Sequence, residues 1–187
     1  MSRSSRPLVT VWLLFAAACG YNTIQTKDEA VNAAGAQIKT QLQRRADLIP
    51  NLVETVKGFA KQETTVFIRV AEARGQLAGA VQGGDLQAMD AANKALNAPL
   101  GRLLALVENY PELKSNQNFL QLQDQLEGTE NRISVARQDY NRTVEDFNAY
   151  IRRFPYNLTA KIIGRGTPRA YFDLTSPDAA DAPKVRF

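Results

Sequence analysis

The chain has 187 residues and a formal net charge of +4, with 44% hydrophobic and 22% charged residues, a composition typical of a folded domain. It contains no histidine and a single cysteine, Cys19, so the commonest general base, the commonest metal ligand and any internal disulfide are missing. The small basic excess also lacks the density of a nucleic-acid-binding surface, and we expect no catalytic residues, no metal, no cofactor and no nucleic acid.

Residues 1–18 have the pattern of a secretory signal peptide. A short cationic start with Arg3 and Arg6 precedes the apolar run Leu8–Ala18, which ends in three alanines. A cationic start, an apolar stretch of about ten residues and a small-residue end are the parts of such a peptide. The run is shorter than the roughly 20 apolar residues of a membrane-spanning helix. We therefore expect the protein to be exported.

Cys19 follows this run directly. The ending Ala16-Ala17-Ala18-Cys19 resembles the lipobox of bacterial lipoproteins, although the lipobox prefers leucine where Ala16 stands. The resemblance implies that Cys19 carries lipid and that residues 19–26 form a lipidated N-terminus and tether. A cleaved signal peptide with an incidental cysteine, or a short uncleaved anchor, are the alternatives. Several acyl chains on one cysteine would give stable membrane attachment, unlike a single chain.

The next segment has the periodicity of a long helix. Apolar residues recur at alternating three- and four-residue spacing over about six heptads, which is typical of a helix packed along one stripe. One seam position reads Ile38, Arg45, Leu52, Phe59, Val66, Ala73 and Ala80, and the other reads Leu42, Ile49, Val56, Glu63, Val70 and Leu77. We expect a helix from about Lys27 to Val81 with a kink at Pro50, or two helices that divide there.

Two further helices follow. Gly83-Gly84 predicts a helix end and Asp85 predicts an N-cap for a helix over 86–107, which Pro99 should kink or divide. A loop over 109–116 precedes a third helix that ends at Pro155. The sequence thus predicts an all-α fold, an elongated up-and-down antiparallel bundle of three to four long helices over residues 27–155. Residues 156–187 are expected to form a mostly irregular tail.

Helix lengths predict a partner. At 1.5 Å per residue, the first helix would be roughly 80 Å long and the second roughly 35 Å, so part of the first seam would lack cover. We therefore expect self-association or binding of envelope proteins through the helix seams. The competing expectation is that the first helix folds back at Pro50 and the chain covers its own seam. The expected core residues are Ile49, Leu52, Val56, Phe59, Phe119, Leu126, Ile133 and Phe147.

Two charged residues interrupt the seams. Arg45 and Glu63 stand where apolar side chains are expected. They either extend to solvent or pair with polar residues of a neighbouring helix, or they mark a polar interface that specifies helix register. Eighteen residues of one helix would separate them by about 27 Å, so they cannot pair with each other.

Several segments resemble the LemA family over nearly the whole chain after the signal. They include the specific stretch Arg44-Arg-Ala-Asp-Leu-Ile-Pro-Asn-Leu52, together with Ala71–Arg74, Asn109–Lys114 and Arg132–Asn141. The resemblance implies a bacterial membrane-associated helical bundle, often encoded near membrane proteases and other envelope proteins. It offers no catalytic residues to carry over.

These observations favour a non-enzymatic scaffold or adaptor of the cell envelope, anchored through Cys19. The alternative is an envelope hydrolase that uses only acidic residues and lysine. By resemblance to lipoprotein sorting, Gly20 in place of aspartate favours the outer membrane, facing the periplasm, if the organism is diderm. A single N-terminal anchor in the inner membrane is the alternative location.

Overall fold

The computed structural model describes residues 20–172. Its helices are α2 (Tyr21–Lys57), α3 (Thr64–Gly83), α4 (Leu86–Val107), α5 (Pro111–Lys114), α6 (Gln117–Arg152) and α7 (Tyr156–Ile162), and no strand occurs among these residues. The all-α prediction is confirmed. Two compact units share the long helices. Unit 1 comprises residues 20–31 and 139–172 of the described chain, and unit 2 comprises residues 32–138.

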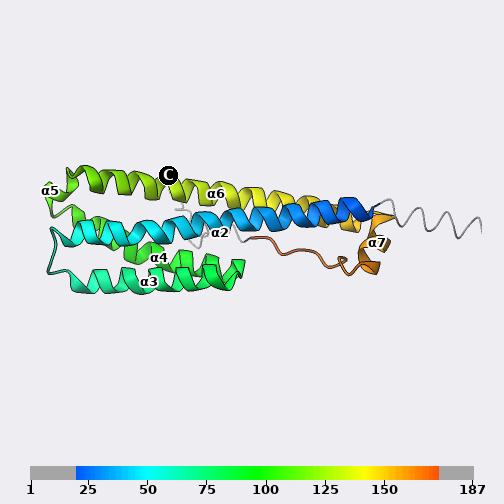
Figure 1. The fold of residues 1–187 in the computed structure, drawn as a ribbon, viewed down its shortest axis with the longest axis horizontal. Helices are drawn as coiled ribbons and strands as arrows, with labels where there is room; N and C mark the ends of the chain where they lie inside the picture. Colours follow the sequence, from blue (N-terminus) through cyan, green and yellow to red (C-terminus); the bar gives the residue numbers. More distant parts are fainter. Residues whose placement is uncertain (1–19, 173–187) are drawn as a thin grey trace, which may run out of the picture. The chain divides into compact units, whose positions relative to one another are not determined.

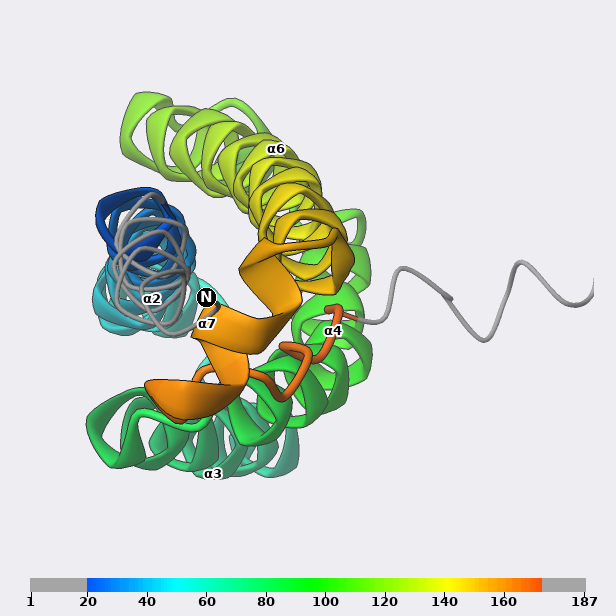
Figure 2. The same ribbon diagram turned by 90° about the vertical axis from the view of Figure 1, so that its right-hand side faces the viewer.

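Unit 2 is a bundle of four helical segments. The larger part of α2, then α3, α4 and the first part of α6, run alternately up and down beside one another (Figures 1 and 2). Each segment buries an apolar stripe, as in α4, where Met89, Leu96, Leu100 and Leu103 are buried. The short helix α5 lies between α4 and α6, inside the stretch that the sequence predicts as a loop.

The prediction of one long first helix is wrong. The chain leaves α2 after Lys57 and enters α3 at Thr64, so α3 runs back along α2 within unit 2 (Figure 1). The amides of Phe59 and Ala60 both donate to the carbonyl of Val56, so the helix ends in a tight turn. Phe59 lies in this turn and is exposed, contrary to its predicted place in the core. The unmatched 80 Å seam therefore does not exist.

Pro50 lies inside α2 without ending it. A proline cannot donate to the carbonyl four residues earlier, which here belongs to Ala46. The Nε of Arg74 on α3 donates to that oxygen at 3.1 Å, so a neighbouring helix supplies the missing hydrogen bond. The exposed position of Pro50 also keeps its ring out of the core. Pro99 similarly lies within α4, which it does not divide.

The predicted junction between α3 and α4 is confirmed. Gly84 has a φ of 79°, a left-handed conformation that glycine adopts without strain, and its amide donates to the carbonyl of Ala80. The carboxylate of Asp85 then accepts the amides of Gln87 and Ala88 at 3.1 and 3.3 Å. It thereby satisfies two of the free donors that begin α4.

Unit 1 contains the start of α2, the end of α6, α7 and the segment that follows it. α2 begins at Tyr21, six residues before the Lys27 expected from the sequence, and its first turns bury Ile24 and Val31. α7 turns away from the axis of α6 and is followed by irregular backbone to Phe172 (Figure 1). All of the predicted core residues except Phe59 are buried, each in its own unit.

Candidate functional site

A buried polar cluster crosses unit 2 at the level of Arg45. The guanidinium Nη1 of Arg45 on α2 donates to Asn93 Oδ1 at 2.6 Å, and Nη2 donates to Asn97 Oδ1 at 3.0 Å. Nη1 also lies 2.6 Å from Glu130 Oε2 on α6. Three helices thus meet at one arginine. Of the alternatives that the sequence left open for Arg45, pairing with polar residues of neighbouring helices matches this arrangement.

Burial lowers the pKa of the Arg45 guanidinium below its ordinary value. The nearby Glu130 carboxylate opposes that effect, and the positive charge of Arg137 adds to it. A second acidic group balances Arg137, because Asp90 of α4 accepts from Arg137 at 2.8 Å and from Lys94 at 2.9 Å. Positive and negative groups therefore alternate through the cluster, and sliding one helix past the others would separate these pairs.

Glu63 is not part of this cluster. It is the residue that precedes α3 and makes no side-chain capping bond there. The structure therefore does not bring together the two polar positions that the sequence singled out, and only Arg45 joins several helices.

A clamp in unit 1 holds the segment after α7. The side chain of Asn148 bonds both backbone groups of Arg169, accepting its amide at 2.8 Å and donating to its carbonyl at 2.9 Å. The Asn141 side chain likewise accepts the amide of Phe172 at 2.7 Å and donates to its carbonyl at 2.9 Å. Each carboxamide thus acts as a peptide group would in a β-ladder.

The spacing of the clamp follows from helix and strand dimensions. Asn141 and Asn148 are seven residues apart on α6, a rise of about 10.5 Å. Arg169 and Phe172 are three residues apart, and extended backbone covers about 10 Å in that distance. The two pairs of hydrogen bonds can therefore form together, with the segment running antiparallel to α6.

Charge and an aromatic contact complete the clamp. The buried carboxylate of Asp28 on α2 lies 2.7 Å from Arg169 Nη2 and 3.0 Å from Arg165 Nη1. Phe172 is buried and meets the ring of Tyr140 edge-on at 6.3 Å. Burial raises the pKa of the Tyr140 phenol, while Arg169 acts in the opposite direction. The last described residues are thus part of the folded unit.

Asn148→Ala should release this segment while leaving the helices folded. The change removes two hydrogen bonds from one backbone position, and each is worth roughly 0.5–1.5 kcal/mol. We expect amide hydrogen exchange at Arg169 to accelerate about 10-fold or more, by comparison with Asn157→Ala on α7. Unchanged exchange at Arg169 would show that the ion pairs with Asp28 hold the segment without the carboxamide.

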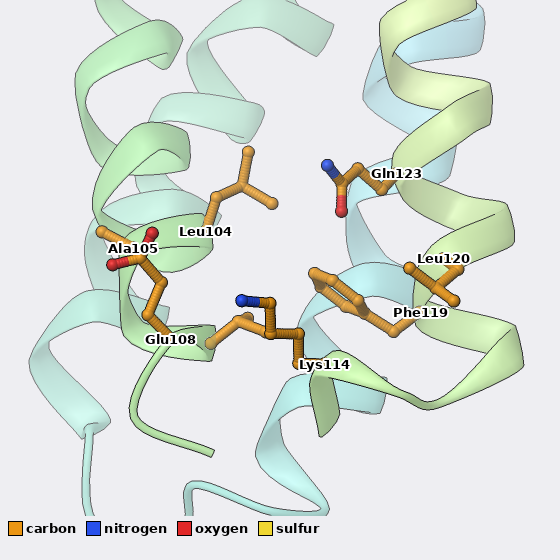
Figure 3. A pocket seen from close by; sticks show the side chains of 8 residues that line it. Leu104, Ala105, Glu108, Lys114, Phe119, Leu120 and Gln123 are labelled. Carbon is orange, nitrogen blue, oxygen red and sulfur yellow. The ribbon is translucent and has the colours of Figure 1, made fainter. Parts of the chain in front are cut away.

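A pocket of about 550 Å³ lies in unit 2 where α4, α5 and α6 meet. Leu104 and Glu108 of α4 face Phe119 and Gln123 of α6, and the Lys114 side chain lies between them (Figure 3). Leu120 lines the same pocket and is exposed. The lining of the pocket is mostly apolar and includes one acidic residue, Glu108, and one basic residue, Lys114.

The remaining site predictions have different outcomes. Cys19 and the signal segment lie outside the described residues. Within residues 20–172, no group of three or more histidine, cysteine or acidic residues is arranged to hold a metal. No helix in that range is both long and apolar enough to span a lipid bilayer. Sequence reasoning missed Asp28, Asn141 and Asn148, although the seven-residue spacing of the two asparagines was visible.

Comparison with known proteins identifies a family and several relatives. The model of the LemA family matches residues 34–187. Magnetosome protein MamQ 2 and magnetosome protein MamQ 1 of Paramagnetospirillum magneticum are each 29% identical over 169 residues, which cover 77% of this chain and 61% of the relative. Magnetosome protein MamQ of Magnetospirillum gryphiswaldense is 26% identical over 167 residues, with the same coverage. The chain spans about three fifths of the length of these relatives.

Proposed function

The chain belongs to the LemA family, and from that premise we propose that it is a membrane-attached, non-enzymatic helical scaffold of the bacterial cell envelope. The proposal rests above all on how the buried polar groups are used. Arg45, Asp90 and Asn93 join helices of unit 2, whereas Asp28 and Asn148 hold the segment after α7. These groups bond to the chain itself, which suits two rigid units that each present surfaces to other proteins.

Membrane attachment is proposed through lipid on Cys19. The support is the signal-like segment 1–18 and the alanine run that ends at this cysteine. In a diderm cell the scaffold would then lie on the periplasmic face of the outer membrane. The relatives are named as magnetosome proteins, and that name concerns a bacterial structure rather than a reaction, in keeping with a role in assembly or maintenance.

The pocket beside Leu120 is the surface proposed for the partner, an envelope protein or a second copy of the chain. Its apolar lining can accept an apolar side chain, and Glu108 and Lys114, which also line it, can orient a polar neighbour. If the protein is instead a hydrolase, the same pocket is the proposed active site, because a carboxylate and a lysine both line it.

A photoreactive phenylalanine analogue in place of Leu120 tests the scaffold in cells. We expect the full chain to form a discrete adduct, and a tagged copy of the identified partner should recover this chain in return. The same analogue at Ile68 on α3 is the matched control, since both side chains are exposed. No adduct at position 120 above that at position 68 would refute the pocket as a partner site.

Two further variants separate the parts of the proposal. Cys19→Ser should move the protein from the membrane fraction to the soluble fraction, and retention of the unprocessed protein in the membrane would favour an uncleaved anchor instead. Glu108→Gln with Lys114→Met should leave the adduct at position 120 in place, because the apolar lining remains. A loss of cellular function with the adduct retained would favour the hydrolase.

A further inference from the structure

Unit 1 exposes an apolar surface around α7. Phe154 is 80% exposed, Leu158 is 52% exposed and Ile162 is 78% exposed. Leu158 and Ile162 are four residues apart and therefore lie on the same face of α7. Thr159 and Ala160 of the same helix are buried, and Ala160 lies on the opposite face. Large apolar side chains grouped in this way mark a surface that contacts something other than water.

The charged residues of the segment around α7 are all basic. Between Phe147 and Phe172 the chain contains Arg152, Arg153, Lys161, Arg165 and Arg169, and no acidic residue. Arg165 and Arg169 pair with Asp28. Arg152, Arg153 and Lys161 are exposed and form no ion pair within residues 20–172. Along the chain these three cations lie within two residues of Phe154 or Ile162, and their charge favours an anionic partner.

The start of the described chain lies against α7. A Cβ atom at Gly20 would lie 2.6 Å from Cδ1 of Tyr156, closer than real side chains approach, so a larger residue would displace the Tyr156 ring. Tyr156 in turn stacks on Tyr150 of α6, with ring centroids 4.5 Å apart. Figure 2 looks onto this end of unit 1, where α7 faces the viewer. The residue after Cys19 is thus packed on the helix that carries the apolar and basic side chains.

We propose that a lipid-facing patch, made of Phe154, Leu158 and Ile162 with Arg152, Arg153 and Lys161, rests on an anionic phospholipid surface. Apolar side chains enter the headgroup boundary, and neighbouring cations bind anionic lipids within about a Debye length. The patch supplies a second attachment beside the N-terminal one, which orients unit 1 on the bilayer. The inference rests on the proposed membrane attachment, because that attachment brings Gly20 to the lipid surface.

Tryptophan fluorescence of the full chain in vesicles tests the patch. Trp12 is the chain's one tryptophan and lies in the proposed signal peptide. Trp12→Phe removes it from any uncleaved chain, so that Leu158→Trp is the one reporter. Vesicles of phosphatidylcholine alone, or mixed with phosphatidylglycerol, carry brominated acyl chains that quench tryptophan at the bilayer. Ile68→Trp in the same background is the matched control, because Ile68 is 53% exposed. Circular dichroism checks that each variant keeps its helical content.

We expect the Leu158→Trp variant to emit at shorter wavelength and to be quenched several-fold more than the Ile68→Trp variant, most strongly with phosphatidylglycerol. Replacing Arg152, Arg153 and Lys161 by glutamine should remove the dependence on phosphatidylglycerol. A chain that floats with vesicles but shows no quenching at position 158 would overturn the patch and leave membrane attachment standing. A chain that does not float would overturn both. Equal quenching in both kinds of vesicle would overturn the preference for anionic lipid.

Discussion

Phe147→Ala should lower the free energy of unfolding by about 3–5 kcal/mol, the range measured for truncation of a fully buried phenylalanine. Phe147 is 1% exposed and is among the largest fully buried side chains of the described residues. It lies on α6 in unit 1, where Ile24, Val144 and Ile151 are also buried. The truncation removes apolar contact and leaves a cavity that the long helices cannot close by a small local shift.

Denaturant unfolding followed by circular dichroism measures this effect, and Phe154→Ala is the matched control. Phe154 is the same residue type in the same unit but is mostly exposed, so its truncation should change stability by less than about 0.5 kcal/mol. A loss below about 1 kcal/mol for Phe147→Ala would mean that the site refills or that the stripe is less buried in solution.

The Arg45 cluster provides the second large effect. Asn93→Leu removes the acceptor 2.6 Å from Arg45 Nη1 and places an apolar group against a buried guanidinium. Removing one partner of a buried charge costs about 3–5 kcal/mol when no other group replaces it. Glu130 and Asn97 still contact Arg45, and the Glu130 side chain is partly exposed, so we expect a loss of about 2–3 kcal/mol.

A double-mutant cycle separates this penalty from lost packing. Arg45→Met with Asn93→Leu replaces both partners by apolar groups, and such replacements are often neutral or stabilising. We expect the double variant to be more stable than Asn93→Leu alone, with a coupling energy of about 1–3 kcal/mol in denaturant melts. Additive losses would show that the two side chains act independently and that Glu130 alone satisfies the arginine.

The sequence predicted which residues of the first two helices face the core, but it did not predict that the chain reverses direction between them. The heptad seams through Leu52 and Val56 continue at Val70 and Leu77, although the chain reverses between Lys57 and Thr64. Both helices bury one stripe, and the turn between them is short enough to leave the pattern without a visible break. Gly58 lies at the reversal, whereas Pro50 is the more conspicuous signal for one.

Pro50 shows why the more conspicuous signal was misleading. Its cost is one unpaired carbonyl, at Ala46, and Arg74 satisfies that oxygen from α3. Arg74 is 24 residues further along the chain, so no local pattern around Pro50 reveals the compensation. The cap at Asp85 is the opposite case, because its acceptors and donors lie within three residues.

By itself, the sequence determined the all-α class, the bounds of α4, the Gly84–Asp85 junction and most of the buried apolar residues. These features depend on local capping chemistry and on a 3.6-residue period that any one helix displays. Only the tertiary structure decided that Arg45 meets Asn93 and Glu130, and that Asn141 and Asn148 hold Phe172 and Arg169. Those pairs join residues 21 to 85 positions apart, and their hydrogen bonds exist only once helix packing has brought the two partners together.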